Sequence, residues 1–411
     1  MTIPTSPLHA IATGRDGSMF EADIAARAVE VAEAVGGRRI LAVGGAGSIG
    51  SSTVLQLARR RPDALHIIDQ NENGLAELVR QLRSQPQTWS ARDFQTLPID
   101  YGSGAMRHFL ASQKPYDLVL NFAALKHVRS EKDPFSTLQM FETNLVKQAR
   151  FMGWLAETGF AGRLFTVSTD KAANPSSMMG ASKRVMEHIL FNSSVAATLQ
   201  GPKTSARFAN VAFSNGSLLQ GFENRFARGE PLAAPLDTRR YFVSLQESGE
   251  LCALAATIAP DQAVVIPKLN PEDHLVLLHE IAEKFLRRHG FEPAAYTDEA
   301  SACANVAAER MKGRWPLLLT ALDTAGEKPY EEFTTAEETT FEIGLPNLRA
   351  VRYAPAERRA IDDAIRLASD MLNARSDEGL DKGHLKQLIA AVEPRFLQTH
   401  RDAAANLDQR L

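Results

Sequence analysis

The sequence feature that most constrains the fold is a glycine-rich turn between a short apolar segment and a helical pattern. Residues 39–43 (Arg-Ile-Leu-Ala-Val) predict a strand, and the turn follows at once, with glycines at 44, 47 and 50. Glycine lets the backbone turn tightly and approach a ligand closely, and the N-terminus of the next helix can bind a pyrophosphate. The predicted contacts to such a dinucleotide cofactor are Gly44, Gly47, Ser48, Ile49 and Gly50.

A carboxylate after the second predicted strand indicates which dinucleotide would bind. Residues 64–68 have a strand pattern that ends at Asp69. In dinucleotide-binding folds, an acidic residue roughly 20 positions beyond the glycine turn accepts hydrogen bonds from the ribose hydroxyls. The same carboxylate would repel a 2′-phosphate, so NAD is favoured over NADP. The alternative is that Asp69 caps the helix predicted at residues 71–82.

The strands and helices that follow predict the fold class. Residues 96–100 and 116–121 have strand patterns. Asp100 is a candidate contact to adenine, and the small residues Ala123 and Ala124 would let the backbone lie against a cofactor. Strands and helices alternate through about residue 215. This alternation predicts an α/β protein with a Rossmann-type, doubly wound parallel sheet.

The chain divides into four predicted parts. They are an N-terminal extension with an amphipathic helix (1–37), an NAD-binding Rossmann domain (38–215), a mainly substrate-binding region (216–350) and a C-terminal helical tail (351–411). The helix is predicted from Ser18 to about Val35, and we expect it to cover a flank of the core rather than to join subunits. The tail should serve as a scaffold or a subunit contact, without catalytic groups.

The densest group of proton-transfer side chains follows the strand predicted at residues 163–167. Thr169, Asp170 and Lys171 come in succession there, and Lys183 lies in the next predicted helix. Open parallel sheets bind ligands at the carboxyl ends of their strands, so we expect these side chains to meet at a catalytic site. The alternative is that Asp170 and Lys171 only pair with each other on a solvated loop.

Composition and charge argue against several classes of partner. The net charge of -3 gives no reason to expect nucleic acid or an anionic membrane. Cys252 and Cys303 are too few for a disulfide framework or a four-sulfur zinc site, and we expect no metal. The sequence has no signal-peptide pattern and no apolar run near the roughly 18 to 20 residues that cross a bilayer. These observations predict a cytoplasmic protein.

Four motifs together resemble a known family. They are the glycine turn, Asn121-Phe-Ala-Ala-Leu-Lys-His127, Ser168-Thr-Asp-Lys-Ala-Ala-Asn-Pro175 and Met179-Gly-Ala-Ser-Lys183-Arg184. Over roughly residues 38–345, the chain resembles the extended short-chain dehydrogenase/reductases, specifically the bacterial polysaccharide-biosynthesis 4,6-dehydratases that act on NDP-N-acetylglucosamine. Residues 124–134 and the N-terminal helix are most similar to the enzymes that begin legionaminic acid synthesis. The implied substrate is GDP- or UDP-N-acetylglucosamine, with the GDP sugar slightly favoured.

The resemblance implies an NAD-dependent lyase that forms a 4-keto-6-deoxy sugar with internal hydride recycling. Lys171 would be the base at C5, Asp170 the acid for the C6 hydroxyl and Thr169 a contact to O4, while Lys183 would bind the nicotinamide ribose. The implied substrate contacts are Lys126, Met179, Asn210, Ser217 and Arg240. For the last three, an asparagine turn, a helix cap and a surface arginine are equally ordinary roles. Homo-oligomerisation is an expectation at the level of the family.

One departure from the family pattern concerns the proton acceptor. The Tyr-x-x-x-Lys pair of the superfamily is here Met179-x-x-x-Lys183, and a thioether cannot take a proton. A methionine at this place resembles the subset of these dehydratases that retains the C5 configuration. Two alternatives stay open, a nucleotide-sugar 4-epimerase and a non-catalytic NAD-binding protein, but neither needs the acid and base that Asp170 and Lys171 offer. His127 is a further candidate base, although a structural histidine is the commoner case.

Overall fold

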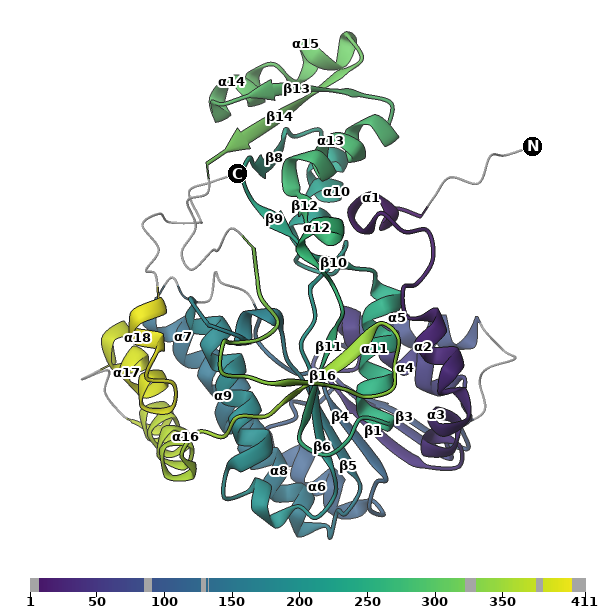
Figure 1. Cartoon of the computed structure of the whole chain (residues 1–411), viewed down its shortest axis with the longest axis vertical. Helices are drawn as coiled ribbons and strands as arrows, with labels where there is room; N and C mark the ends of the chain where they lie inside the picture. The colour runs from purple at the N-terminus through teal and green to yellow at the C-terminus, as the bar shows by residue number, and fades with distance from the viewer. Residues whose placement is uncertain are drawn as a thin grey trace.

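The computed structural model describes residues 7–84, 91–126, 131, 133–321, 330–374 and 380–400. Within these residues, nine strands form one large sheet in the order β15-β16-β11-β6-β5-β4-β1-β2-β3 (Figure 1). The parallel strands are β1 (Arg39–Val43), β2 (Ala64–Ile68), β3 (Asp93–Leu97), β4 (Leu118–Asn121), β5 (Arg163–Val167), β6 (Lys203–Ala206) and β11 (Ala263–Pro267). β15 (Thr340–Glu342) and β16 (Leu348–Arg352) complete one edge as antiparallel strands. The predicted Rossmann-type sheet is confirmed.

Helices cover both faces of the large sheet. On one face lie α4 (Ser48–Ala58), α5 (Glu72–Arg83) and α11 (Leu245–Thr257), and on the other α6 (Gly104–Ser112), α8 (Lys147–Glu157) and α9 (Met178–Asn192) (Figure 1). Because both faces are covered, strands such as β1 and β2 are nearly continuous apolar runs. β1 pairs with β2 on one side and with β4 on the other, so the strand order reverses there. Sheets of this kind bind ligands at the carboxyl ends of the strands at that switch point.

The helical connection between β4 and β5 contains a π-helical turn. α7 (Pro134–Phe141), the π turn η2 (Glu142–Val146) and α8 follow one another without a break. Asp133 begins this connection by accepting a hydrogen bond from the Ser136 N–H. π turns are frequent at functional sites. Lys147, the residue directly after η2, lines the larger of the two cavities described below.

A second, smaller sheet stands beside the large one. Its parallel strands are β8 (Leu232–Pro235), β13 (Glu292–Tyr296) and β14 (Arg314–Thr320), and its helices include α10 (Leu218–Arg228) and α13 (Leu278–Arg288). Phe222, Phe285 and Trp315 fill its own apolar core. Residues 216–350, which we expected to be mainly substrate-binding, also supply β11, β15 and part of β16 to the large sheet. β11 belongs there because all five of its residues are buried.

The N-terminal extension packs against the flank of the large sheet. The single helix predicted from Ser18 to Val35 is instead two helices, α2 (Glu21–Ala26) and α3 (Ala28–Val35), because Arg27 leaves the helical conformation. Phe20 is fully buried, and α3 packs on α11. Asp23, also fully buried, accepts hydrogen bonds from the backbone N–H and the side-chain amide of Asn347. The extension thus covers a flank of the core.

The C-terminal tail lies against the face of the sheet that carries α9. α16 (Arg358–Asn373) and α17 (Lys382–Val392) both contact α9, and the short α18 (Phe396–Thr399) follows α17 (Figure 1). With the sheet on one side and the tail on the other, every residue of α9 from Met178 to Phe191 is buried. The helix that carries Lys183 is therefore part of the interior.

Candidate active site

The glycine turn is packed so closely that it admits no side chains at two positions. Gly44 has a φ of 69°, and a Cβ there would lie 2.5 Å from the backbone N of Ala123. A Cβ on Gly50 would lie 2.4 Å from the carbonyl oxygen of Gly44. The N–H groups of Ser48 and Ile49 lie in the first turn of α4, where no preceding turn can accept their hydrogen bonds. This turn fits the pyrophosphate of a dinucleotide.

A cavity of about 620 Å³ opens beside the glycine turn, at the carboxyl ends of β1, β2 and β4. Its walls include Gly44, Gly47, Asp69, Asp100, Ala123 and Ala124, all predicted as cofactor contacts. Asp69 accepts hydrogen bonds from the backbone N–H groups of Ala46 and Asn71, both at 2.9 Å. Asn71 caps α5 by accepting from the Gly74 N–H at 3.0 Å, so the alternative of Asp69 as the cap is wrong.

Asp100 lies on the wall of this cavity but already has a charged partner. Its Oδ2 accepts from the Lys147 ammonium at 2.5 Å, and its Oδ1 accepts from the Gly102 N–H at 2.8 Å. Burial raises the pKa of Asp100, but these hydrogen bonds outweigh burial and hold it below the ordinary value. Lys147 lines the cavity too, and the sequence offered no sign of it, because its position depends on the π turn before it.

A second pocket of about 230 Å³ adjoins the first, and Phe122 and Ala124 line both. Its other walls hold Ile49, a predicted cofactor contact, and most of the predicted catalytic and substrate-binding residues: Lys126, Thr169, Asp170, Lys171, Met179, Lys183, Asn210 and Ser217. The structure therefore brings together side chains from β4, β5, α9 and the start of α10. Arg240 is the one predicted substrate contact that does not line this pocket.

Asp170 is a buried carboxylate with one oxygen engaged and one unengaged. It follows Thr169 in a short 3-10 turn after β5 and is 1% exposed. Oδ1 accepts hydrogen bonds from the Thr169 hydroxyl at 2.7 Å and from the Lys171 N–H at 2.9 Å. Oδ2 has no hydrogen-bond partner within the described part of the chain. Since buried polar atoms are nearly always paired, a substrate group fits as the partner of Oδ2.

Lys171 lies between two buried carboxylates. Its Nζ is 3.6 Å from Asp170 Oδ1 and 3.8 Å from Glu331 Oε1. Burial lowers the pKa of Lys171, but the two carboxylates outweigh burial and raise it above the ordinary value. Lys171 is thus an ammonium ion at neutral pH. Asp170 is buried, and the Lys171 side chain, 24% exposed, lies on the pocket wall, so the pair does not lie on a solvated loop, as the alternative required. Glu331 was not predicted for the site, although it lies in a segment, residues 326–332, that has the family pattern.

Lys183 is a buried amine next to the same pocket. Its Nζ donates to the carbonyl oxygen of Val167 at 2.7 Å, and the residue is 4% exposed. Burial lowers the pKa of Lys183 to about 7. Met179 lies one helical turn earlier, and no tyrosine lines the pocket within the described residues. A group that can exchange a proton near neutral pH therefore lies one helical turn from Met179, the residue at the place of the family's tyrosine.

The remaining predicted substrate contacts are placed in different ways. The Lys126 ammonium donates to the carbonyl oxygen of Asn215 at 3.0 Å. Ser217 lines the pocket and also caps α10, where its Oγ accepts from the Gln220 N–H. Asn210 lies in the two-residue strand β7 (Asn210–Val211) at the edge of the pocket.

Arg240 is neither a surface arginine nor part of the pocket wall. It belongs to β9 (Arg239–Arg240) and is 5% exposed. Its positive charge lowers the pKa of Lys171, so it lies close to the ion pair without lining the pocket. The candidate base His127 falls outside the described residues.

The strand order, the glycine turn at the switch point and the lysine-bearing helix after β5 define the fold of an extended short-chain dehydrogenase/reductase. The sequence profile of a family described as polysaccharide biosynthesis protein matches residues 40–352. That match spans most of the chain, which therefore belongs to this family.

Relatives in sequence are distant. An uncharacterized membrane protein, MJ1061, from Methanocaldococcus jannaschii is 28% identical over 62% of this chain and 74% of its own. The probable polysaccharide biosynthesis protein EpsC of Bacillus subtilis is 24% identical over 84% of this chain, but over only 54% of its own length. A UDP-N-acetylglucosamine 4,6-dehydratase (inverting) from Campylobacter jejuni is 24% identical, covering 60% of this chain and 71% of its own. Among the described residues of this chain, none of the helices combines the length and the apolar character of a membrane-spanning segment.

Solved structures support the fold. Pen from Bacillus thuringiensis superimposes with a TM-score of 0.62 at 20% identity, covering 82% of this chain and 98% of its own. The UDP-Glc/GlcNAc 4-epimerase from Campylobacter jejuni superimposes with a TM-score of 0.54 at 15% identity. The match covers 81% of this chain and 100% of the epimerase. The UDP-glucuronic acid 4-epimerase from Bacillus cereus, solved with UDP-glucuronic acid and NAD, superimposes with a TM-score of 0.50 at 14% identity. The match covers 88% of this chain and 99% of that epimerase.

Proposed function

We propose that the protein is an NAD-dependent nucleotide-sugar 4,6-dehydratase that acts on GDP- or UDP-N-acetylglucosamine. The observation that carries this proposal is the Asp170–Lys171 ion pair, 3.6 Å apart, on the wall of the same pocket as Lys183. Elimination of water across C5 and C6 needs a base and an acid in addition to the groups that serve C4. A 4-epimerase needs no such second pair, so the pair favours the dehydratase.

The residues around the two adjoining cavities fit NAD. The glycine turn and the start of α4 would hold its pyrophosphate, Asp69 its adenosine ribose and Lys183 its nicotinamide ribose. When bound, NAD would take a hydride from C4 and return it to C6, with no net redox change. The Asp69 carboxylate opposes the 2′-phosphate of NADP. The relative from Bacillus cereus, whose structure holds NAD, supports this choice.

One proton transfer would put Asp170 and Lys171 into the states that elimination requires. In the ion pair, Lys171 is protonated and Asp170 is a carboxylate, so neither can yet play its role. Moving the proton from Lys171 Nζ to the Asp170 carboxylate leaves a neutral amine, which can remove the C5 proton, and a carboxylic acid, which can protonate the departing C6 hydroxyl. The 3.6 Å separation is longer than a hydrogen bond and must shorten when substrate binds. Thr169, which donates to Asp170 Oδ1, would bind O4.

Retention at C5 forms part of the proposal. A tyrosine is absent from the pocket walls that the structure describes, and Met179 occupies its place on α9. One base on one face of the sugar would then both remove and return the C5 proton. The dehydratase from Campylobacter jejuni carries the word inverting in its name, so retention at C5 would distinguish this protein from that relative. The product formed in deuterated water, compared by NMR at C5, tests this point.

The experiment that tests the function is mass spectrometry with NMR on the purified protein. The protein is incubated with GDP- and with UDP-N-acetylglucosamine separately, with no added cofactor. Loss of one water together with a new C6 methyl signal is the expected result, and it names the nucleotide. An unchanged mass with altered sugar signals would instead establish a 4-epimerase. Tight NAD binding without turnover of either sugar would indicate a non-catalytic protein.

A further inference from the structure

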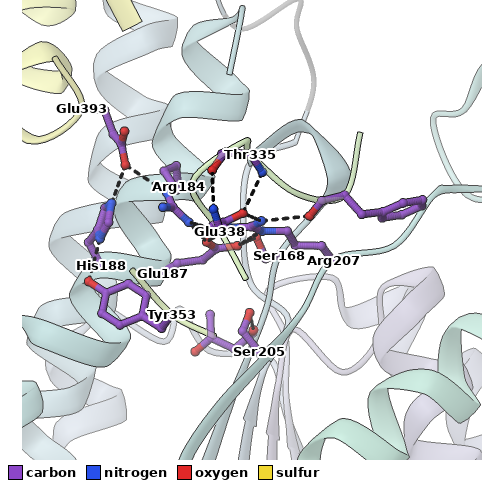
Figure 2. A network of polar contacts seen from close by, with 12 residues as sticks. Ser168, Arg184, Glu187, His188, Ser205, Arg207, Thr335, Glu338, Tyr353 and Glu393 are labelled. Carbon is purple, nitrogen blue, oxygen red and sulfur yellow. Dashed lines mark hydrogen bonds and ion pairs between the residues drawn. The ribbon is translucent and has the colours of Figure 1, made fainter. Parts of the chain in front are cut away.

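A buried ionic network includes Ser168, which also lines the smaller pocket of the candidate active site (Figure 2). At its centre is Arg207, fully buried just after β6. Its guanidinium donates to Glu187 at 2.7 and 2.8 Å and to Glu338 at 2.7 and 2.8 Å. Arg184, from the same helix as Glu187, donates to both of these carboxylates, at 2.9 and 2.7 Å. Removing one member of such a buried group leaves an uncompensated charge, so its geometry is strongly held.

This network reaches from the C-terminal tail to the catalytic segment. Glu393, just after α17, accepts from Arg184 Nε at 2.9 Å. Arg184 donates to Glu187 Oε2, and Glu187 Oε1 accepts from the Ser168 hydroxyl at 2.6 Å. Ser168 immediately precedes Thr169. Three successive contacts therefore join the tail to the segment that carries the acid and the base.

The end of β5 is attached to two successive turns of α9. Lys183 donates to the carbonyl oxygen of Val167, and Glu187, one turn later, accepts from the next residue, Ser168. These two contacts fix the direction in which the chain leaves the strand. They therefore fix where the following side chains point.

The tail makes a second contact at the other end of the catalytic segment. The Thr399 hydroxyl donates to the carbonyl oxygen of Pro175 at 2.6 Å, and His400 Nδ1 lies 3.2 Å from the carbonyl oxygen of Ser176. Residues 175 and 176 come between the catalytic segment and the start of α9. The tail thus holds this segment at both ends.

We propose that the C-terminal tail positions the catalytic segment, residues 168–176, with Glu393 and Thr399 as its positioning residues and Arg184 and Glu187 as the links. None of the four needs to touch substrate. The tail lies beyond residues 40–352, which the family profile matches, so this role is an addition to the family's shared part. The activity readout below rests on the proposed function, whereas the exchange readout does not.

The test uses variants of Ser168 and Glu393, the two residues at the ends of the series of contacts. Ser168→Ala removes the hydroxyl that binds Glu187, and Glu393→Gln removes the charge that binds Arg184. Ser205→Ala is the matched control, because Ser205 is an equally buried serine on β6 that donates to the Thr166 carbonyl oxygen at 2.7 Å. Glu187→Gln is avoided, since it would leave buried guanidinium groups without a counter-charge and endanger the fold.

Two measurements on variants of the full-length chain test whether the tail positions the catalytic segment. Hydrogen exchange of the amides in residues 168–176 should become faster in Ser168→Ala and Glu393→Gln and stay unchanged in Ser205→Ala. In the same two variants kcat should fall about 10-fold to 100-fold, as expected when reacting groups are misplaced, while KM for the nucleotide sugar changes little. Glu393→Asp, which keeps the charge, should recover part of the lost kcat.

The outcomes separate this proposal from the proposed function. Unchanged exchange in both variants overturns the positioning role, whatever the activity. The same changes in Ser205→Ala would also overturn it, because they would reflect a general loss of packing. If the wild-type protein turns over neither sugar, the dehydratase assignment fails, but the exchange comparison still decides the role of the tail.

Discussion

At the scale of single residues, Lys171 and Lys183, which line the same pocket, have pKa values shifted in opposite directions. Lys171 is held as an ammonium ion by Asp170 and Glu331, whereas burial brings the pKa of Lys183 to about 7. The difference arises because Lys171 has two carboxylates within 4 Å, whereas the one hydrogen-bond partner of the Lys183 ammonium among the described residues is a carbonyl oxygen. Each shift leads to a separate prediction.

Replacing Lys171 should abolish elimination and leave the fold intact. Lys171→Ala removes the proposed base, and we expect kcat to fall about 100-fold to 10,000-fold. The matched variant Lys171→Arg keeps the positive charge but cannot lose a proton, so it should be as inactive as the alanine variant. Turnover is measured by mass spectrometry of the product, and NAD content serves as the control for folding. Wild-type turnover in either variant would contradict the assignment of Lys171 as the base.

The buried Lys183 should make stability depend on pH. Its pKa is about 7 in the folded protein against an ordinary 10.5, so between these values the unfolded chain binds a proton that the folded chain does not. Stability should therefore rise with pH from about 7 to 10.5, by an amount on the order of a few kcal/mol. Lys183→Met should remove this rise. The measurement is the free energy of unfolding of both NAD-free proteins against pH, and parallel curves would contradict the depressed pKa.

At the scale of elements, the glycine turn offers a matched pair of substitutions. A Cβ on Gly50 would lie 2.4 Å from the Gly44 carbonyl oxygen, whereas a Cβ on Gly47 would have no neighbour closer than 3.5 Å. Gly50→Ala should destabilise the NAD-free protein by about 1–3 kcal/mol, the usual cost of overpacking. Gly47→Ala should have little effect, since its φ of -68° suits alanine. Thermal unfolding of the two variants checks the difference, and equal melting temperatures would contradict the packing described.

The elements that the sequence predicted best are those with a local pattern. The apolar runs of β1 and β5 and the glycines before α4 are each visible within a few residues, and the structure places all of them as expected. The prediction of a single helix across Arg27 was wrong, because the break between α2 and α3 at this residue depends on how the extension packs. Local periodicity does not contain that information.

The parts of the site that the sequence missed depend on distant segments meeting. Glu331 lies far along the chain from Lys171, and no spacing rule joins them. Lys147 reaches Asp100 only because a π turn precedes it. Arg240, by contrast, was selected on resemblance and proved to be buried beside the pocket without lining it. Proximity of this kind is a property of the packed molecule.

At the scale of the whole molecule, cofactor binding should be visible as added stability. A ligand that binds only the folded state at about 100 times its Kd adds about 2.7 kcal/mol. We expect NAD to raise the melting temperature and NADP to have little effect, because Asp69 lies on the cavity wall. Asp69→Asn should reduce the difference between the two cofactors. Equal shifts from NAD and NADP in the wild-type protein would contradict the assigned role of Asp69.

The contact between Asp23 and Asn347 has a consequence for how the protein is made. Asn347 directly precedes β16, so the N-terminal helices dock on a part of the sheet that is synthesised more than three hundred residues later. During translation, α2 and α3 emerge from the ribosome long before the surface that they bind has been synthesised. Their apolar side therefore has no packing partner during that time. The first strands can pair early, but the sheet edge can close only after residue 352 has been added. Completion of the large sheet is therefore a late step in the folding of the nascent chain.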